Sequence, residues 1–338
     1  MMGLTAVAKT ILPKPFRNWL KGLNSTRLLA QYSVYDFNRF HRHSSAGGLR
    51  GSLAHEDAEM TKTYHAIEKG LSLPVPRPGF GAIVVSRLAN TLARRIRNNG
   101  PWTPACAHSL NALSAYLRHA REGSAAIPKG VEEVLSLAAE RGLEISGKPT
   151  KPIRREDVEA ATSFDAERFF WSRHSVRQFS DEALEAAFLL KAIDMARSTP
   201  SVCNRQSGRV HIFMKPEDKE RILRHQNGNR GFGDTAGAIL VVTSDLSAFV
   251  DPSERYQAWI DGGMFAMTIT LALHALGLGS CCLNWSSPPQ LDKALHRDGS
   301  IPAGETVIML LAVGRLRESF AVATSDRLPV SEIARVIQ

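Results

Sequence analysis

Two short segments in the second half of the chain carry side chains suited to binding an anion and a flat ring. In the first, Arg173, Ser175 and Arg177 alternate within the sequence RHSVRQF. Alternate side chains of an extended chain point the same way, so these three residues would form a charged, hydroxyl-bearing ledge. Because guanidinium groups bind phosphate oxygens through paired, charge-assisted hydrogen bonds, the segment favours a phosphate site.

The second segment, TPSVCNRQ at residues 199–206, places amide groups in a loop. Pro200 and Ser201 are typical of a turn, which leaves Asn204 and Gln206 to donate and accept hydrogen bonds. A planar heterocycle with carbonyls and ring nitrogens along one edge needs such groups. On local composition alone, ordinary loops at helix ends remain the preferred interpretation of both segments.

Common enzyme signatures are missing from the sequence. It contains no P-loop, no GxGxxG after a strand, no HExxH and no GxSxG elbow. His65 and Glu68 lie three residues apart on an expected helix, but no third metal ligand is evident. We therefore predict an exposed polar face there and no metal site. No side chain is an evident general acid or base, so no catalytic residue is assigned.

The cysteines and the N-terminus favour a reducing, cytoplasmic compartment. The four cysteines form neither a disulfide framework nor a CxxC pattern. Residues 1–11 lack the charged region, long apolar core and cleavage site of a secretory leader. Residues 263–283 are uncharged and long enough to span a membrane. However, Gly277, Gly279 and the lack of flanking Lys and Arg favour a buried helix that ends near Gly277.

The net charge of +9 is unevenly divided along the 338 residues. Residues 1–150 contain 20 Lys and Arg and 10 Asp and Glu, whereas residues 151–338 contain 22 and 23. This asymmetry predicts two units, joined through the Gly-, Pro- and Lys-rich residues 142–152. The basic first unit is expected to have either a solvated face without a partner or an anionic partner such as a membrane surface. No nucleic-acid partner is expected.

Within the first unit, residues 16–40 interleave aromatic and basic side chains. They predict a helix that either packs on the rest of the protein, which we prefer, or lies at a membrane interface. Helical spacing resumes at residues 88–96 and 109–121, after a loop rich in Pro and Gly at 74–81. The first 150 residues are therefore expected to be mainly helical, with an unknown role.

The second half alternates helices with short apolar strands. The spacing predicts helices at 181–197, capped by Ser180, at 216–225 and at 253–276, and strands at 209–214, 238–243, 281–285 and 307–313. The last strand, VIMLLAV, is too apolar to be exposed on either face. This alternation predicts an α/β or α+β layered domain.

Taken in order, these segments resemble the nitroreductase family of FMN-dependent oxidoreductases. The resemblance covers about residues 169–328 and rests on RHSVRQF, ARSTPSVCNRQ, GAILVV, a long helix ending in ALGLGS, VIMLLAVG and DRLP. One motif alone is weak, but the series is specific. It implies an α+β domain with a central mixed sheet flanked by helices, preceded by the helical N-terminal region. It also implies FMN as the cofactor and a homodimer.

The resemblance assigns FMN contacts to four parts of the sequence. The first polar segment is implied to meet the phosphate, ribityl chain and pyrimidine end, and the second to reach the isoalloxazine edge from the other subunit. The backbone after ALGLGS is implied to face flavin N5, and the DRLP arginine to bind phosphate. The expected cofactor-binding residues are Arg173, His174, Ser175, Arg177, Pro200, Ser201, Asn204, Gln206, Leu283, Asn284, Trp285 and Arg327.

Three features depart from the usual pattern of the family. Ser207 and Gly208 stand where many members have Pro-Trp, and Ser325 stands where many have a lysine. Asn284 and Trp285 replace the more usual small or acidic residues near N5. FMN binding is still expected, while the substrate range is left open.

The resemblance implies that hydride moves from NAD(P)H through flavin N5 to a small organic acceptor. Positive charge from Arg177 would stabilise the reduced, anionic flavin. Flavin-fragmenting enzymes and azoline dehydrogenases share the same resemblance. An alternative of a different class is a flavin-binding module without turnover, docked by its basic N-terminal half to a membrane or a polymer-synthesis assembly.

Overall fold

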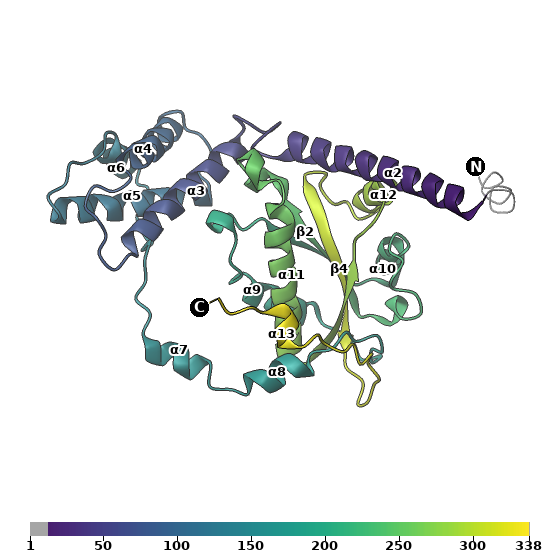
Figure 1. Ribbon diagram of the computed structural model, residues 1–338. Helices are drawn as coiled ribbons and strands as arrows, with labels where there is room; N and C mark the ends of the chain where they lie inside the picture. The colour runs from purple at the N-terminus through teal and green to yellow at the C-terminus, as the bar shows by residue number, and fades with distance from the viewer. Residues whose placement is uncertain (1–12, 338) are drawn as a thin grey trace.

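The computed structural model describes residues 13–337, so the prediction about a leader in residues 1–11 lies outside the described chain. Figure 1 shows a helical first part joined to a domain built around a sheet. The helices of the first part are α2 (Lys14–His43), α3 (Leu53–Leu71), α4 (Ala82–Arg97), α5 (Pro104–Glu122) and α6 (Val131–Glu140). Two short helices, α7 (Arg155–Ala161) and α8 (Ala166–Ser172), lie in the long connection to the sheet domain.

The sheet domain alternates helices and strands as the sequence predicts. Its elements are α9 (Ala186–Ala196), β1 (Gly208–Phe213), α10 (Pro216–Leu223), β2 (Ala238–Asp245), α11 (Gln257–Ala275), β3 (Leu278–Asn284), α12 (Pro289–Asp298), β4 (Glu305–Arg315) and α13 (Val330–Ile333). Single turns of 3-10 helix are η1 (Val202–Asn204), η2 (Gly233–Thr235), η3 (Leu246–Ala248) and η4 (Pro252–Glu254).

The four strands form one sheet in the order β1-β2-β4-β3. All three strand pairs are antiparallel. One isolated parallel bridge, between Ser175 and Ser280, continues the sheet beyond β3. The Val176 amide donates a hydrogen bond of 2.9 Å to the Ser280 carbonyl there. The four strands therefore form an antiparallel sheet where a mixed one was expected, and the parallel direction is limited to this bridge; the predicted α+β class is confirmed.

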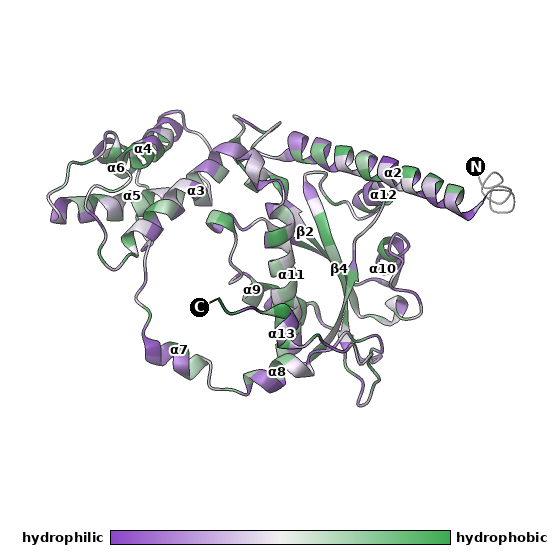
Figure 2. Ribbon diagram, in the orientation of Figure 1, coloured by the Kyte–Doolittle hydropathy of each residue, from purple (hydrophilic) through white to green (hydrophobic). Residues whose placement is uncertain are grey.

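Helices cover both faces of the sheet. Along β2, Ile239 and Val241 pack toward α10 and α12, whereas Leu240 and Val242 pack toward α9 and α11. A strand buried on both faces needs apolar residues at every position, which explains the continuous run AILVV. Figure 2 shows the corresponding hydrophobic colouring along much of β4.

The helix predicted from Asp181 begins later, at Ala186. Phe179 forms a bridge with Leu316, and the Ser180 amide donates to the Arg315 carbonyl, so this part of the chain is held extended against β4. The Ser180 hydroxyl instead accepts a hydrogen bond from the Glu182 amide in a turn.

The apolar run at 263–283 is divided between a helix and a strand. Helix α11 ends at Ala275, and β3 begins at Leu278 after Gly277 in the left-handed conformation. Across residues 13–337, none of the helices has both the length and the apolar character needed to cross a membrane.

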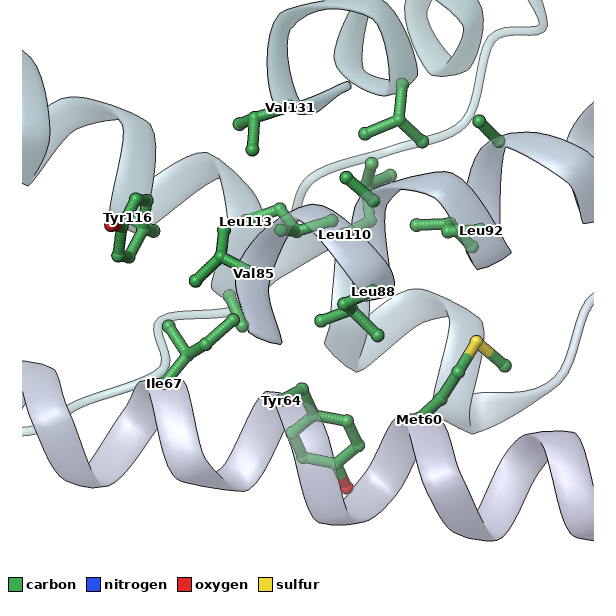
Figure 3. Packing of buried hydrophobic residues seen from close by; sticks show 14 of the residues in the cluster. Met60, Tyr64, Ile67, Val85, Leu88, Leu92, Leu110, Leu113, Tyr116 and Val131 are labelled. Carbon is green, nitrogen blue, oxygen red and sulfur yellow. The ribbon is translucent and has the colours of Figure 1, made fainter. Parts of the chain in front are cut away.

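Helices α3 to α6 form a bundle with a core of its own. Figure 3 shows Tyr64 and Ile67 of α3 facing Val85 of α4 and Leu113 of α5 across that core. The cluster of buried residues in this core lies between Met60 and Ala138 and includes none from the sheet domain. We call helices α3–α6 the bundle.

Helix α2 has no core of its own, and its C-terminal half packs on the sheet domain; helix α3 of the bundle also lies against that domain, at η1 and η3. The Arg39 guanidinium lies 2.6 Å from the Asp292 carboxylate of α12, and both side chains are about nine-tenths buried. Phe40 packs on a buried cluster that includes Leu246 and Phe249. The predicted division of the chain after residue 150 stays a prediction.

Candidate functional site

The RHSVRQF segment lies along the outer edge of β3. Its backbone is fixed there by the Ser175–Ser280 bridge, and Val176 is buried in the core beneath. Arg173 and Ser175 are half-buried, whereas His174 and Arg177 are exposed. The sheet therefore holds the backbone of this segment in place while most of its polar side chains stay accessible.

Arg173 and Arg177 bring two positive charges to one point of β3. Burial raises the pKa of the Cys281 thiol, and both guanidinium groups act in the opposite direction, so both lie near that side chain. Neither arginine forms an ion pair within residues 13–337. Two cations without a carboxylate partner fit an anionic group such as the phosphate of FMN.

Two residues that the sequence analysis missed, Arg205 and Asp261, hold the backbone of the TPSVCNRQ loop in place. The buried Arg205 guanidinium bonds the Ala248 carbonyl at 2.9 Å and pairs with the Glu254 carboxylate. The Asp261 carboxylate accepts a hydrogen bond of 3.0 Å from the Val202 amide. Asp261 is the single Asp, Glu, Lys or Arg residue of α11, and a lone carboxylate in an apolar helix is a signal from which a buried partner could have been predicted.

The pinned loop carries backbone strain. Cys203, Asn204 and Gln206 have φ values of 48°, 54° and 49°, in the left-handed region that residues other than glycine seldom adopt. Such conformations persist where the surroundings fix them, and they are concentrated at binding sites. They leave the Gln206 side chain exposed and that of Asn204 half-buried.

A cavity of about 160 Å³ lies against this loop. Pro200, Ser201 and Gln206 line it together with Asp261 and Phe265 of α11. The Gln206 amide also donates to the Ser201 hydroxyl at 2.9 Å. The structure therefore brings three of the four expected residues of this segment to one cavity, and Asn204 lies just beside them in the chain.

The residues after ALGLGS lie at the end of β3 and in the loop that follows. Leu283 is buried in the core, and the exposed Asn284 offers its carbonyl to the Gln226 side-chain amide at 3.2 Å. The Trp285 indole donates a hydrogen bond of 2.8 Å to the Asp292 carboxylate. Contacts from two other elements therefore hold this loop.

One chain does not bring the two polar segments together. The RHSVRQF segment lies outside β3, and the TPSVCNRQ loop leads into β1, so the whole sheet separates them. Four strand spacings of about 4.8 Å amount to roughly 19 Å. This distance agrees with a site shared between two subunits, and the shared site stays a prediction.

Arg327 follows β4 in the chain. It is exposed in the extended chain between β4 and α13, and its guanidinium donates to the Ser325 carbonyl. The contact of Arg327 with the FMN phosphate stays a prediction.

An exposed apolar face lies beside the TPSVCNRQ loop. One side of α11 packs on the sheet through residues such as Ile269 and Leu273. Its other side exposes Ile260, Met264 and Met267. Leu190 and Met195 of the neighbouring helix α9 are exposed as well. We call these five exposed residues the α9–α11 face.

Comparisons with known proteins agree on the second half of the chain. Residues 171–227 and 218–315 match the model of the nitroreductase family. Among solved structures, the chain is similar to an FMN-dependent nitroreductase from Clostridium difficile, with 22% identity over 49% of this chain and 96% of that one and a TM-score of 0.42. It is also similar to a nitroreductase-like protein from Streptococcus mutans, with 20% identity over 51% and 97% and a TM-score of 0.46. No curated protein matches the sequence.

Proposed function

We propose that the protein is an FMN-dependent oxidoreductase, because residues 171–315 match the model of the nitroreductase family. Members of this family are flavoproteins. The observation that carries the proposal is the pair of guanidinium groups without carboxylate partners, Arg173 and Arg177, beside the Ser175 hydroxyl at the edge of β3. We further propose NAD(P)H as the reductant and a small organic molecule as the acceptor.

Each part of the site has a role in this proposal. Arg173 and Ser175 bind the phosphate and ribityl chain, and Arg177 stabilises negative charge that develops on the cofactor during reduction. FMN, when bound, supplies the acceptance and release of hydride. The loop after β3, held by Gln226 and Asp292, borders the reacting region.

The cofactor is proposed to be FMN and not FAD, because the cationic segments offer ligands for a terminal phosphate and nothing for an adenosine half. Heat-released cofactor separated by chromatography identifies it. We expect FMN, and finding FAD or no flavin after reconstitution overturns the proposal. Arg173→Ala is expected to weaken FMN binding by about 1.5–3 kcal/mol, the contribution of one charged hydrogen bond. The control Arg168→Ala changes a nearby exposed arginine in α8 and should leave affinity unchanged.

We propose that the protein is an intertwined homodimer with α11 at its centre. The α9–α11 face supports this, because it exposes five large apolar side chains on two neighbouring helices, and a second copy of the chain could cover them. Sedimentation velocity of the FMN-loaded protein tests it. A stable monomer that retains flavin contradicts the shared site.

Steady NAD(P)H oxidation with an added quinone or nitroarene distinguishes an enzyme from a flavin-binding module without turnover. A screen for acceptors that reoxidise the reduced, flavin-loaded protein then addresses the substrate. Bound flavin that turns over with none of the acceptors favours the module.

A specific feature of α2 favours a membrane role beside the oxidoreductase activity. Phe16, Trp19, Leu20 and Leu23 follow the spacing of one helix face, and all four are exposed, Trp19 by 57%. We call them the α2 stripe. The basic side chains of α2 suit anionic headgroups, each adding about 1 kcal/mol near the surface. We propose that the stripe docks on an anionic membrane.

Vesicle flotation tests the docking proposal. The full chain should float with vesicles containing phosphatidylglycerol and not with phosphatidylcholine alone. Loss of flotation in Trp19→Ser with Leu23→Ser supports the stripe as the contact. Unchanged flotation in that variant, no flotation at all, or a second copy seated on the stripe in solution overturns it.

A further inference from the structure

A pocket of about 440 Å³ between the last turns of α2 and helix α12 gathers positive side chains. Arg42, His43 and Asn38 line it from α2, and Lys293 and His296 line it from α12. We propose that this pocket binds a phosphate group. It shares no residue with the segments assigned to FMN, so the proposal does not depend on the proposed function.

The positive charge of the pocket has no counter-ion. Arg39 also lines the pocket, but it is neutralised by the Asp292 carboxylate at 2.6 Å. Arg42 and Lys293 form no ion pair with any residue between 13 and 337. No Asp or Glu lines the pocket. Two charges therefore remain uncompensated in a concave site, where an anion stabilises them.

The pKa of His43 is lowered partly by the positive charge around the pocket. Burial and then the positive charges of Arg39, Arg42 and His296 lower the pKa of this imidazole. Cations in the last turn of a helix are favoured by the helix dipole, which accounts for Arg42 and His43. It does not account for Lys293, which comes from the middle of α12.

The donors in the pocket suit phosphate in number and type. The Arg42 guanidinium offers a planar fork, and the Lys293 ammonium offers a compact point charge. The Asn38 amide adds neutral donors, and none of these three side chains hydrogen-bonds another described residue. Lys293 Nζ lies 5.4 Å from the centroid of the Tyr35 ring, which forms part of the wall.

A phosphate group reaches such a pocket from a soluble phosphorylated molecule or from a lipid headgroup. Val34 and Phe37, next to the pocket residues of α2, are exposed by 57% and 66%. Apolar side chains beside a phosphate pocket are compatible with a headgroup, and the pocket alone is compatible with a soluble ligand. The experiment below distinguishes the two sources.

Calorimetric titration of the full chain with pyrophosphate tests the soluble source. We expect saturable binding to the wild-type protein and a loss of about a hundredfold or more in Arg42→Gln with Lys293→Gln, since each charged hydrogen bond contributes about tenfold. The control Arg118→Gln with Lys148→Gln removes the same charge at exposed positions outside the pocket and should change affinity by under about twofold. All four residues are exposed, and thermal melts without ligand verify folding.

Flotation with phosphatidic acid in phosphatidylcholine vesicles tests the lipid source. If a headgroup occupies the pocket, the pocket variant loses its preference for phosphatidic acid over phosphatidylcholine alone, and pyrophosphate competes with the vesicles. If the ligand is soluble, the pocket variant loses pyrophosphate binding and floats like the wild type. The proposal is overturned if the pocket variant matches the wild type with both probes, or if the control variant loses binding equally.

Discussion

Helix α2 and the bundle belong to the same basic half of the sequence but relate to the sheet domain in different ways. The bundle buries its apolar side chains against one another, from Met60 to Ala138, and its helix α3 also lies against η1 and η3 of the sheet domain. Helix α2 has no such core. Its C-terminal half packs on α12 through Arg39 and Asp292, and its N-terminal half exposes the α2 stripe.

The excess of positive charge in residues 1–150 is therefore shared by two parts with different structural roles, the bundle and helix α2. A helix of 30 residues without its own core needs surfaces on other molecules or domains to bury its apolar side chains. The bundle meets that need internally, so its stability is expected to be largely independent of α2. The stability of α2 is expected to follow the sheet domain instead.

The largest expected effect belongs to the contact between α2 and α12. Arg39→Ala leaves the Asp292 carboxylate buried without its cation, and losing one partner of a buried pair costs about 4 kcal/mol of unfolding free energy. Urea unfolding measures the loss of unfolding free energy. Hydrogen exchange should then become faster in α2 and in the sheet domain. The control Arg97→Ala breaks an exposed pair with Glu133 in the bundle and should cost under about 1 kcal/mol. Equal losses for the two variants would contradict the distinction.

A second substitution perturbs the core of the bundle and leaves the contact between α2 and α12 unchanged. Leu113→Ala removes a fully buried side chain and is expected to cost about 3 kcal/mol, from lost burial and the cavity left behind. Hydrogen exchange should accelerate in α3 to α6 and stay unchanged in β2 and β4. Faster exchange throughout the sheet would show that the two regions unfold as one unit.

The contact between α2 and α12 is also expected to depend on pH. Burial raises the pKa of Asp292, but the Arg39 charge and hydrogen bonds from Tyr35 and Trp285 outweigh it, so the net pKa is lowered. The stabilisation is therefore complete above the unfolded pKa of about 4 and is lost as the pH falls below it.

Asp292→Asn tests this dependence. Urea unfolding between pH 7 and pH 3 should show a smaller acid-induced loss of stability in the variant than in the wild type. Glu56→Gln serves as the control in the bundle, where Arg95 and Arg94 lower the pKa of Glu56 against the opposing effect of burial. Its effect should be confined to the bundle. Parallel pH curves for Asp292→Asn and the wild type would refute the role of the carboxylate.

The smallest expected change in stability concerns the α2 stripe. Leu23→Ser alters an exposed side chain, so the unfolding free energy should change by no more than about 0.5 kcal/mol. A thermal melt measures this. A loss of several kcal/mol would mean that the stripe is already buried against another part of the protein or a second copy.

Most of the sheet domain could be predicted from the sequence because its central strands, β2 and β4, are buried on both faces. A short, continuous apolar run such as residues 238–243 is typical of a strand that is covered on both faces. The start of α9 was wrong because pairing of Phe179 and Ser180 with the end of β4 overrode a local capping signal. Boundaries decided by tertiary contacts are not readable from local spacing.

The candidate site could be predicted as segments but not as an arrangement. The residue types of RHSVRQF and TPSVCNRQ pointed to the two segments, and the structure places them at opposite edges of the sheet. The supports behind them were not predictable. Asp292 holds Trp285 while bound to Arg39, which is distant in sequence, and no local pattern encodes such a contact.

The most direct test of the shared FMN site uses two defective variants of the full chain. One carries Arg173→Ala and Arg177→Ala, the other Asn204→Ala and Gln206→Ala, and each homodimer should bind little FMN. Co-expression with different affinity tags allows the heterodimer to be purified and its flavin measured by absorbance. If the segments come from different subunits, one site of the heterodimer is intact, and about one FMN binds per dimer. If the heterodimer binds as little FMN as the two homodimers, the site is not shared and the account is contradicted.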